Sequence, residues 1–238
     1  MRPENVETDN GHGRAIPPDY ERDPGRFPVA RSFLRHHALA PDVHGRVAER
    51  LIAEGLTPVL DVECGEGELA RHLPVGAWVG VDSSPARLAR APEPKHLAKA
   101  TVLPFPDASF GAVALLYVLY HLLPDLALAG AHRVLRPVGL VAVAAPSRDD
   151  SPELTDALPR TPLTLDSERA PELLGELFTE VEVERWEAPP LELPTRAAVR
   201  DYLIGKGVES HVAEGQAEAV AVPLSVTKRG ALAFGRKA

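Results

Sequence analysis

Short apolar runs alternate with stretches of helical periodicity through the middle of the chain. Continuous runs rich in Val, Ala and Leu are typical of parallel strands buried on both faces of a sheet. The stretches between them repeat apolar residues at helical spacing and carry helix-start or helix-end residues. The runs predict strands at 58–62, 77–81, 110–117 and 138–144, a weaker strand around 96–102, and helices at 41–55, 69–72, 83–90 and 124–135.

This alternation predicts an α/β fold with a doubly wound, mostly parallel sheet and right-handed crossovers. A helix near 166–178 leads into 181–186, where apolar and charged residues alternate. Such alternation indicates a half-exposed strand, of the kind found where an antiparallel pair closes a mostly parallel sheet. Thr195 is placed to cap a helix through 203, and the last strand is expected at 231–234.

The first 40 residues differ in composition and periodicity from the middle of the chain. The first 25 residues are rich in Pro, Gly and charge, which is typical of a polar tail, and 27–38 repeats apolar residues at near-helical spacing. We therefore expect a tail and helical lid at 1–40 and one domain over 41–238, with a substrate-side insert at about 188–207. A chain of 238 residues suits a single α/β domain.

Composition excludes several classes of partner. The formal net charge is -8 and the Lys and Arg residues form no long run, which disfavours a nucleic-acid partner. The single Cys, Cys64, is expected to be a small buried thiol, because it has no second Cys for a disulfide or zinc site. No stretch approaches the ~20 apolar residues of a membrane span. We expect a soluble cytoplasmic protein with no metal and no membrane partner.

The stretch 59–69, V-L-D-V-E-C-G-E-G-E-L, has the order strand, tight turn, helix. A dinucleotide-binding fingerprint needs glycines at its first, third and sixth positions, and a template started at Glu63 finds glycine only at the third, Gly65. The Gly-Lys-Ser/Thr of a phosphate-binding loop is missing. Asp82 ends the second strand, where a carboxylate can accept both hydroxyls of a ribose. The pattern best suits a nucleoside without phosphates.

Four stretches between about 57 and 145 carry a recognisable pattern: V-L-D-V-E-C-G-E-G from Val59, G-V-D-S-S from Gly80, L-P-F-P-D-A-S-F from Leu103 and R-V-L-R-P-V-G from Arg133. In this order and spacing they resemble the class I S-adenosylmethionine-dependent methyltransferases, in particular the small-molecule branch related to the ubiquinone and menaquinone biosynthesis enzymes. The weaker resemblance continues to the end of the chain. The resemblance implies a Rossmann-like, seven-stranded sheet whose last strand is antiparallel.

The resemblance also implies a role for each matching residue. It gives the methionine end of S-adenosylmethionine to the turn after the first strand, and the ribose hydroxyls to the acid that ends the second. Other positions would lie beside the adenine or near the sulfonium. The implied cofactor-binding residues are Asp61, Glu63, Gly65 and Gly67 in the turn, Asp82 for the ribose, Ser83, Ala100 and Thr101 beside the adenine, and Tyr117 near the sulfonium.

Four positions depart from the family pattern. Glu63 and Val138 replace glycines, Lys99 stands where an acid usually contacts the adenine amine, and Gly111 stands where an Asp usually follows the Phe. Three orientations are open for the Glu63 carboxylate. It turns outward, pairs with the cofactor's ammonium group, or fills the cofactor pocket, since glycine at such positions permits close approach and positive φ.

His121 is the candidate catalytic base, because it follows the fourth strand, where the ligand crevice of such a sheet opens. A structural role for this histidine stays equally open. His36, His37 and His211 are more typical of surface residues, and Tyr20 would matter only if the tail folded over the cofactor.

The expected function is methyl transfer from S-adenosylmethionine to a small-molecule acceptor, such as a secondary metabolite. Apolar residues of the insert, Leu191, Leu193, Tyr202 and Leu203, suggest an apolar or aromatic acceptor, although packing alone would also explain them. The alternative is a degenerate member that binds a ligand or partner, or catalyses another reaction. A dehydrogenase is remote, since two of three fingerprint glycines are missing. Acceptor identity and oligomeric state stay undetermined.

Overall fold

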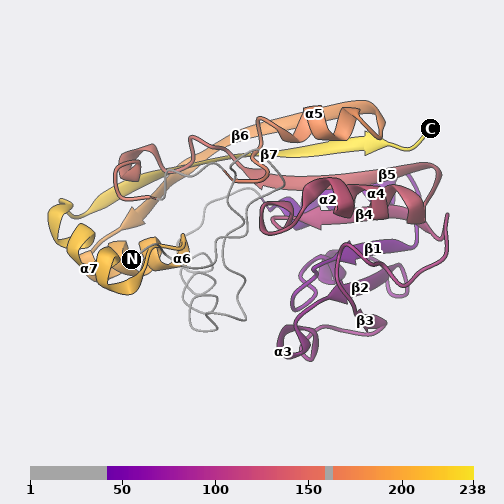
Figure 1. The fold of residues 1–238 in the computed structure, drawn as a ribbon, viewed down its shortest axis with the longest axis horizontal. Coiled ribbons are helices and arrows are strands. Elements are labelled where there is room, and N and C mark those ends of the chain that lie inside the picture. The colour runs from indigo at the N-terminus through magenta and orange to yellow at the C-terminus, as the bar shows by residue number, and fades with distance from the viewer. Residues whose placement is uncertain (1–41, 159–162) are drawn as a thin grey trace. The chain divides into compact units, whose positions relative to one another are not determined.

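The computed structural model describes residues 42–158 and 163–238 (Figure 1). These residues divide between two compact units. The sheet unit comprises Asp42–Ser147, Thr164–Arg185 and Gly230–Ala238. The insert unit comprises 148–158, 163 and Trp186–Arg229. The expected tail and lid at 1–40 lie outside the described residues, as do Tyr20, His36 and His37.

The sheet has seven strands in the order β3-β2-β1-β4-β5-β7-β6. β1 pairs in parallel with β2 and β4, β2 with β3 and β4 with β5, whereas β7 pairs antiparallel with β5. The predicted doubly wound, mostly parallel sheet with an antiparallel last strand is therefore confirmed. The strands are β1 Val59–Val62, β2 Trp78–Asp82, β3 Lys95–Leu97, β4 Phe110–Leu116, β5 Leu135–Pro146, β6 Thr179–Leu193 and β7 Leu224–Arg236.

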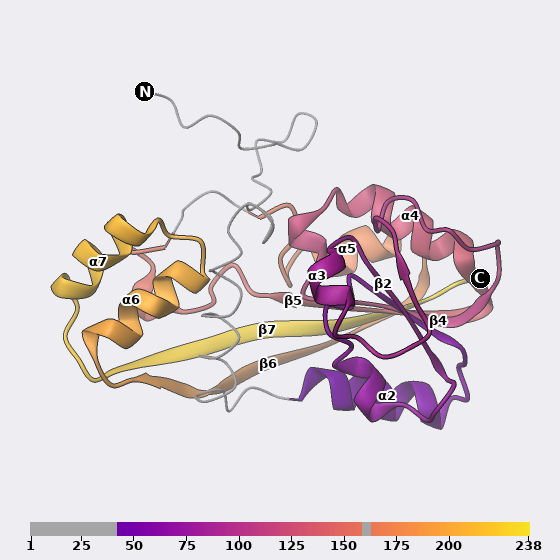
Figure 2. The same ribbon diagram turned by 90° about the horizontal axis from the view of Figure 1, so that it is seen from below.

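Helices cover the two faces of these strands, with α2 on one side and α4 and α5 on the other (Figure 2). The α4 and α5 residues Leu128, Ala131 and Leu174 pack with Val113 and Val141 of the sheet in one buried apolar core. Asp42 caps α2, because its Oδ1 accepts a hydrogen bond from Gly45 N at 2.9 Å. The helices of the sheet unit are α2 Val43–Ala53, α3 Pro85–Leu88, α4 Pro124–Val134 and α5 Ala170–Gly175, with short 3-10 turns η1 Leu69–His72 and η2 Leu119–His121.

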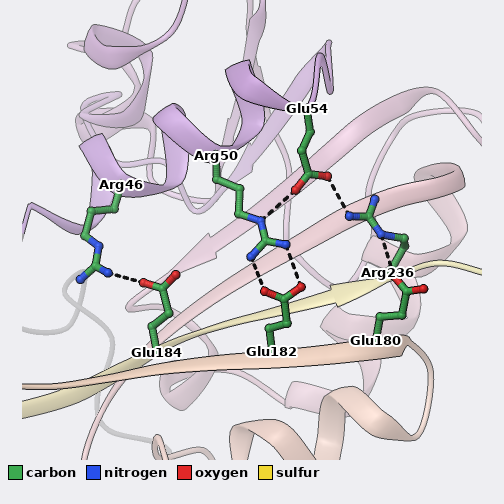
Figure 3. A network of polar contacts seen from close by, with 7 residues as sticks. All are labelled: Arg46, Arg50, Glu54, Glu180, Glu182, Glu184 and Arg236. Carbon is green, nitrogen blue, oxygen red and sulfur yellow. Dashed lines mark hydrogen bonds and ion pairs between the residues drawn. The ribbon is translucent and has the colours of Figure 1, made fainter.

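A ladder of ion pairs joins α2 to β6 and β7 (Figure 3). Arg50 donates two hydrogen bonds to Glu182, at 2.7 and 2.9 Å, and one to Glu54 at 2.9 Å. Arg236 in turn pairs with Glu54 at 2.7 Å and Glu180 at 3.2 Å. The charged positions of the alternating 181–186 pattern thus meet the arginines of a neighbouring helix. Glu180 and Glu182 are exposed, so their pairs contribute little to stability, whereas Arg50, Arg236 and Glu54 are half-buried.

The insert unit has its own apolar core. It contains α6 Arg196–Gly205, α7 Ser210–Ala219 and the short turn η3 Pro152–Leu154. Thr195 caps α6 as expected, because its Oγ1 accepts a hydrogen bond from Ala198 N at 3.2 Å. The buried residues of this core include Leu191, Leu193, Tyr202 and Leu203, the side chains that the sequence offered for acceptor recognition.

The structure corrects several element boundaries. β3 ends at Leu97 instead of continuing to 102, and the exposed Val102 lies in a turn. α5 is shorter than the expected helix, because Asp166 Oδ1 accepts a hydrogen bond from Arg169 N at 2.9 Å and forms a turn before it. α7 was not expected. Its buried residues are only Ala213 and Ala217, so its apolar periodicity is weak.

Candidate functional site

The turn after β1 holds three residues with left-handed backbone. Glu63, Gly65 and Gly67 have φ of 54°, 58° and 76°. A Cβ on Gly67 would lie 2.5 Å from Pro92 Cδ, so packing as well as conformation excludes other residues there. Gly67 N donates to Cys64 O at 2.9 Å and Cys64 N donates to Val81 O at 2.9 Å. The turn is therefore tied both to itself and to the end of β2.

Asp82 holds this turn from the end of β2. Its carboxylate is fully buried and accepts hydrogen bonds from Gly65 N at 2.7 Å and Ser84 N at 2.8 Å, one on each oxygen. The Arg87 guanidinium lies 4.0 Å from the Oδ2 atom. Each carboxylate oxygen keeps a further lone-pair site, but the side chain has no exposed surface, so hydroxyl donors reach these sites only if a neighbouring group moves aside.

Asp61, on β1, is buried beneath the turn. Its Oδ2 accepts a hydrogen bond from Trp78 Nε1 at 3.1 Å. Burial above all, with a further contribution from the charge of Asp82, raises the pKa of Asp61 to about 7. Gly80 gives the indole its space, because a Cβ there would lie 2.3 Å from the Trp78 ring. Asp61 is thus a carboxyl group that gains a proton close to neutral pH.

The Glu63 carboxylate faces the predicted adenosine-binding residues. It accepts hydrogen bonds from Ser83 Oγ at 2.9 Å, Ser83 N at 3.3 Å and Ala100 N at 3.4 Å. Burial, followed by the charge of Asp82, raises its pKa. Of the three orientations that the sequence left open, the structure has the carboxylate turned inward, onto the backbone N–H groups expected beside the adenine.

The other candidate residues singled out in the sequence make fewer contacts with this site. Burial, and then the charge of Asp61, raises the pKa of the Cys64 thiol. The residue is half-buried, whereas a buried thiol was expected. Lys99 is exposed and Thr101 is half-buried. His211 is exposed on α7, in keeping with its expected surface role.

Tyr117 and His121 follow β4, the strand beside β1. Tyr117 has φ of 59°, and its N donates to Ala144 O at 2.9 Å. The η2 turn is held by Thr164 Oγ1, which donates to Leu119 O at 3.3 Å. His121 is half-buried, with its ring centroid 4.4 Å from that of Tyr120. These contacts fix the backbone on either side of the candidate base.

Three features of the family-like stretches have structural explanations. A Cβ on Gly111 would lie 2.8 Å from Thr57 N, so the close approach of that backbone requires glycine. Arg133 donates to Phe105 O at 2.7 Å and Leu103 O at 2.9 Å, and so joins two of the four stretches. Val138 has φ of 58°, a conformation suited to the glycine that it replaces.

The structure brings many of the predicted residues together. Glu63, Ser83 and Ala100 form one hydrogen-bonded group and Gly65 and Asp82 form another. The charge of Asp82 acts on both Glu63 and Asp61. Sequence reasoning missed Trp78 and Arg87. The spacing of Trp78 and Gly80 on one strand face was a usable signal for the first, whereas nothing in the sequence pointed to Arg87.

Strand order, an antiparallel β7 and a glycine turn at the end of β1 define the Rossmann-like fold of class I methyltransferases. Residues 60–143, from β1 into β5, match the family model described as a methyltransferase domain. The resemblance found in the sequence is therefore confirmed. A search of curated proteins found no match.

Solved structures share this fold at low sequence identity. The YcgJ protein from Bacillus subtilis is 16% identical with a TM-score of 0.57, over 81% of this chain and 98% of its own. A possible histamine N-methyltransferase from Thermotoga maritima is 16% identical with a TM-score of 0.58, over 92% and 98%. The [4+2]-cyclase SpnF is 18% identical with a TM-score of 0.57, over 93% and 98%.

Within the described residues no helix is both long and apolar enough to span a membrane. The same residues contain no group of His, Cys, Asp and Glu side chains arranged to hold a metal ion.

Proposed function

We propose that this protein transfers a methyl group from S-adenosylmethionine to a small-molecule acceptor. The observation that carries the proposal is the turn after β1, where left-handed Gly65 and Gly67 lie against a buried Asp82 inside the matched methyltransferase domain. The small-molecule acceptor is supported by a neighbour described as a possible histamine N-methyltransferase. The acidic net charge also argues against a nucleic-acid acceptor.

The chemistry of the residues suits the methionine and ribose ends of the cofactor. We assign the methionine portion to Asp61, Gly65 and Gly67, and the ribose hydroxyls to the spare acceptor sites of Asp82. The position of a carboxylate at the end of β2 supports this assignment, which also requires the groups that cover the Asp82 side chain to move aside.

At the adenine end the fit requires a movement. Ser83 and Ala100 are assigned to the adenine together with Thr101, but the Glu63 carboxylate now accepts hydrogen bonds from the first two. Cofactor binding therefore requires the Glu63 side chain to leave these N–H groups. This competition lowers affinity without removing the site.

The bound cofactor would supply an activated methyl group on its sulfonium. The protein then has to align the acceptor, exclude water and accept a proton where the acceptor atom carries one. We assign the alignment beside the sulfonium to Tyr117 and the proton transfer to His121 Nδ1 or Nε2. Alignment of this kind can supply ~7–11 kcal/mol of the barrier reduction, and a positioned base a further ~10²–10⁴-fold in rate.

The test is calorimetric titration of S-adenosylmethionine and S-adenosylhomocysteine into the parent protein, Glu63→Gly and Val138→Gly. We expect the parent to bind and Glu63→Gly to bind roughly tenfold or more tightly, because displacing the carboxylate costs more than ~1.4 kcal/mol. Val138→Gly is the matched control, since it also restores a family glycine, and it should leave affinity unchanged. If neither the parent nor Glu63→Gly binds at millimolar cofactor, the proposal is wrong.

The inward Glu63 carboxylate also favours a second candidate function. On this reading the chain is a degenerate member that binds a ligand or partner, or catalyses a different reaction. SpnF, described as a [4+2]-cyclase, shows the same fold in a protein named for other chemistry. Cofactor binding by Glu63→Gly but not by the parent would support this second function against the first.

A further inference from the structure

Within the insert unit, side chains from three separated segments meet around the buried carboxylate of Asp150. Its Oδ2 accepts hydrogen bonds from Lys206 Nζ at 2.6 Å and from Lys228 Nζ at 2.5 Å, and its Oδ1 accepts from Arg229 N at 2.9 Å. Only 5% of the Asp150 side chain is exposed. Asp150 follows β5, Lys206 ends α6 and Lys228 lies on β7. We call this group the lysine-pair cluster.

The lysine-pair cluster has one positive charge too many if both amines are protonated. Two ammonium groups share one carboxylate oxygen, and the nearby Arg229 guanidinium is already paired with Glu187 at 2.9 Å. Burying an uncompensated charge is expensive, so such a site tends to lose a proton. Desolvation disfavours the charged form most strongly for the lysine whose side chain is less exposed. The Lys228 side chain is 16% exposed and that of Lys206 is 30% exposed.

Lys228 is therefore the amine that gives up its proton. Burial first, and then the charge of Lys206, lowers the pKa of Lys228, while the charge of Asp150 acts in the opposite direction. Lys206 keeps its proton and supplies the neighbouring cation. A lysine beside a second cationic group is the arrangement that activates an amine as a nucleophile near neutral pH.

Two hydroxyl groups lie within reach of this amine. Lys228 Nζ is 2.8 Å from Tyr202 OH and 3.3 Å from Ser151 Oγ, and the two oxygens are 2.5 Å apart. Burial raises the pKa of Tyr202, so its phenol stays protonated and able to donate. Nucleophile, neighbouring cation and proton donor are thus gathered around one carboxylate.

We propose that Lys228 is a reactive amine that forms a Schiff base with a small aldehyde or ketone. The Nζ lone pair attacks the carbonyl carbon, a C–N bond forms, and the carbonyl oxygen takes a proton from the Tyr202 hydroxyl. One amine proton released by the adduct restores the phenol, and the carbinolamine then loses its hydroxyl together with its remaining N–H proton as water. The product is an imine, with no oxidant or reductant consumed. The inference does not rest on methyl transfer.

The test is labelling of the full-length protein with propanal and sodium cyanoborohydride between pH 6 and pH 9. Cyanoborohydride reduces the imine to a stable secondary amine, which peptide mass spectrometry locates and counts. Lys99, which is exposed, is the internal reference. At pH 7 we expect Lys228 to be modified at least about tenfold faster than Lys99. A structural ion pair predicts the reverse, because a protonated and half-buried amine reacts slowly. Lys228 labelling at or below the rate of Lys99 would overturn the proposal.

Two variants test the role of the neighbouring cation, with folding checked by circular dichroism. Lys206→Gln removes the charge, so the pH midpoint of Lys228 labelling should move upward by about one unit or more. Lys206→Arg keeps the charge and should keep the parent profile. An identical profile in the parent and Lys206→Gln would contradict the mechanism. The comparison within the parent protein stands even if Lys206→Gln fails to fold.

Discussion

Two positions in the sheet unit carry another residue where the resemblance places glycine. Glu63 lies in the turn after β1 and Val138 lies within β5, and both have left-handed backbone, with φ of 54° and 58°. The Val138 side chain is 65% exposed, and its backbone is held by hydrogen bonds to Lys237 O and from Arg236. The Glu63 carboxylate instead accepts hydrogen bonds from Ser83 and Ala100.

The difference separates a tolerated substitution from one with structural consequences. At Val138 the strained backbone costs stability and the side chain points into solvent. At Glu63 the same kind of strain is offset by contacts that the side chain makes with its surroundings. These contacts use the N–H groups assigned to the adenine, so the substitution bears on function. Three measurements test this difference.

The largest effect is expected from removing the carboxylate that holds the β1 turn. Asp82→Ala leaves the buried N–H groups of Gly65 and Ser84 without their acceptor, at ~1–3 kcal/mol each. We expect the free energy of unfolding to fall by about 3 kcal/mol, measured by urea denaturation. The control is Asp107→Ala, since Asp107 is 78% exposed and pairs with Arg133 at 2.9 Å, and it should cost under about 1 kcal/mol. Equal losses would show that the turn is not held from β2.

The sequence predicted the scaffold of this turn but not its internal contacts. Apolar runs fixed β1, β2 and β4, and acids at strand ends marked Asp61 and Asp82, because buried parallel strands leave a strong periodic signal. The direction of the Glu63 carboxylate depends on a rotamer and on neighbours distant in the chain. Gly111 was read as a lost Asp, whereas its reason is the Thr57 backbone beside it. Such contacts carry no periodicity.

The second largest effect is a pH dependence of stability that comes from Asp61, the buried carboxyl group next to the turn that holds Glu63. The pKa of Asp61 is raised to about 7, so the folded protein holds a proton that the unfolded chain has lost. Stability from this group is present at low pH and is lost as pH rises through 7. Asp61→Asn removes that loss, so its free energy of unfolding relative to the parent should rise by about 2–3 kcal/mol between pH 5 and pH 8.

The exposed Asp125 supplies the control for this measurement. Asp125→Asn should change stability by the same small amount at both pH values. A parallel pH profile for Asp61→Asn and the parent would mean that Asp61 does not take up a proton near neutral pH in the folded state. Denaturant unfolding at pH 5, 6, 7 and 8 gives the required profile.

The smallest effect is expected at Val138, where only strain is at issue. A β-branched residue in the left-handed region costs ~1–3 kcal/mol, and glycine adopts it freely but adds entropy to the unfolded chain. Val138→Gly should therefore raise the free energy of unfolding by about 1 kcal/mol, equally at pH 5 and pH 8, because no buried carboxylate takes part. Val75→Gly is the matched control, an exposed valine without positive φ, and it should not stabilise. A loss of stability in Val138→Gly would mean that the valine side chain contributes contacts of its own, and the contrast with Glu63 would disappear.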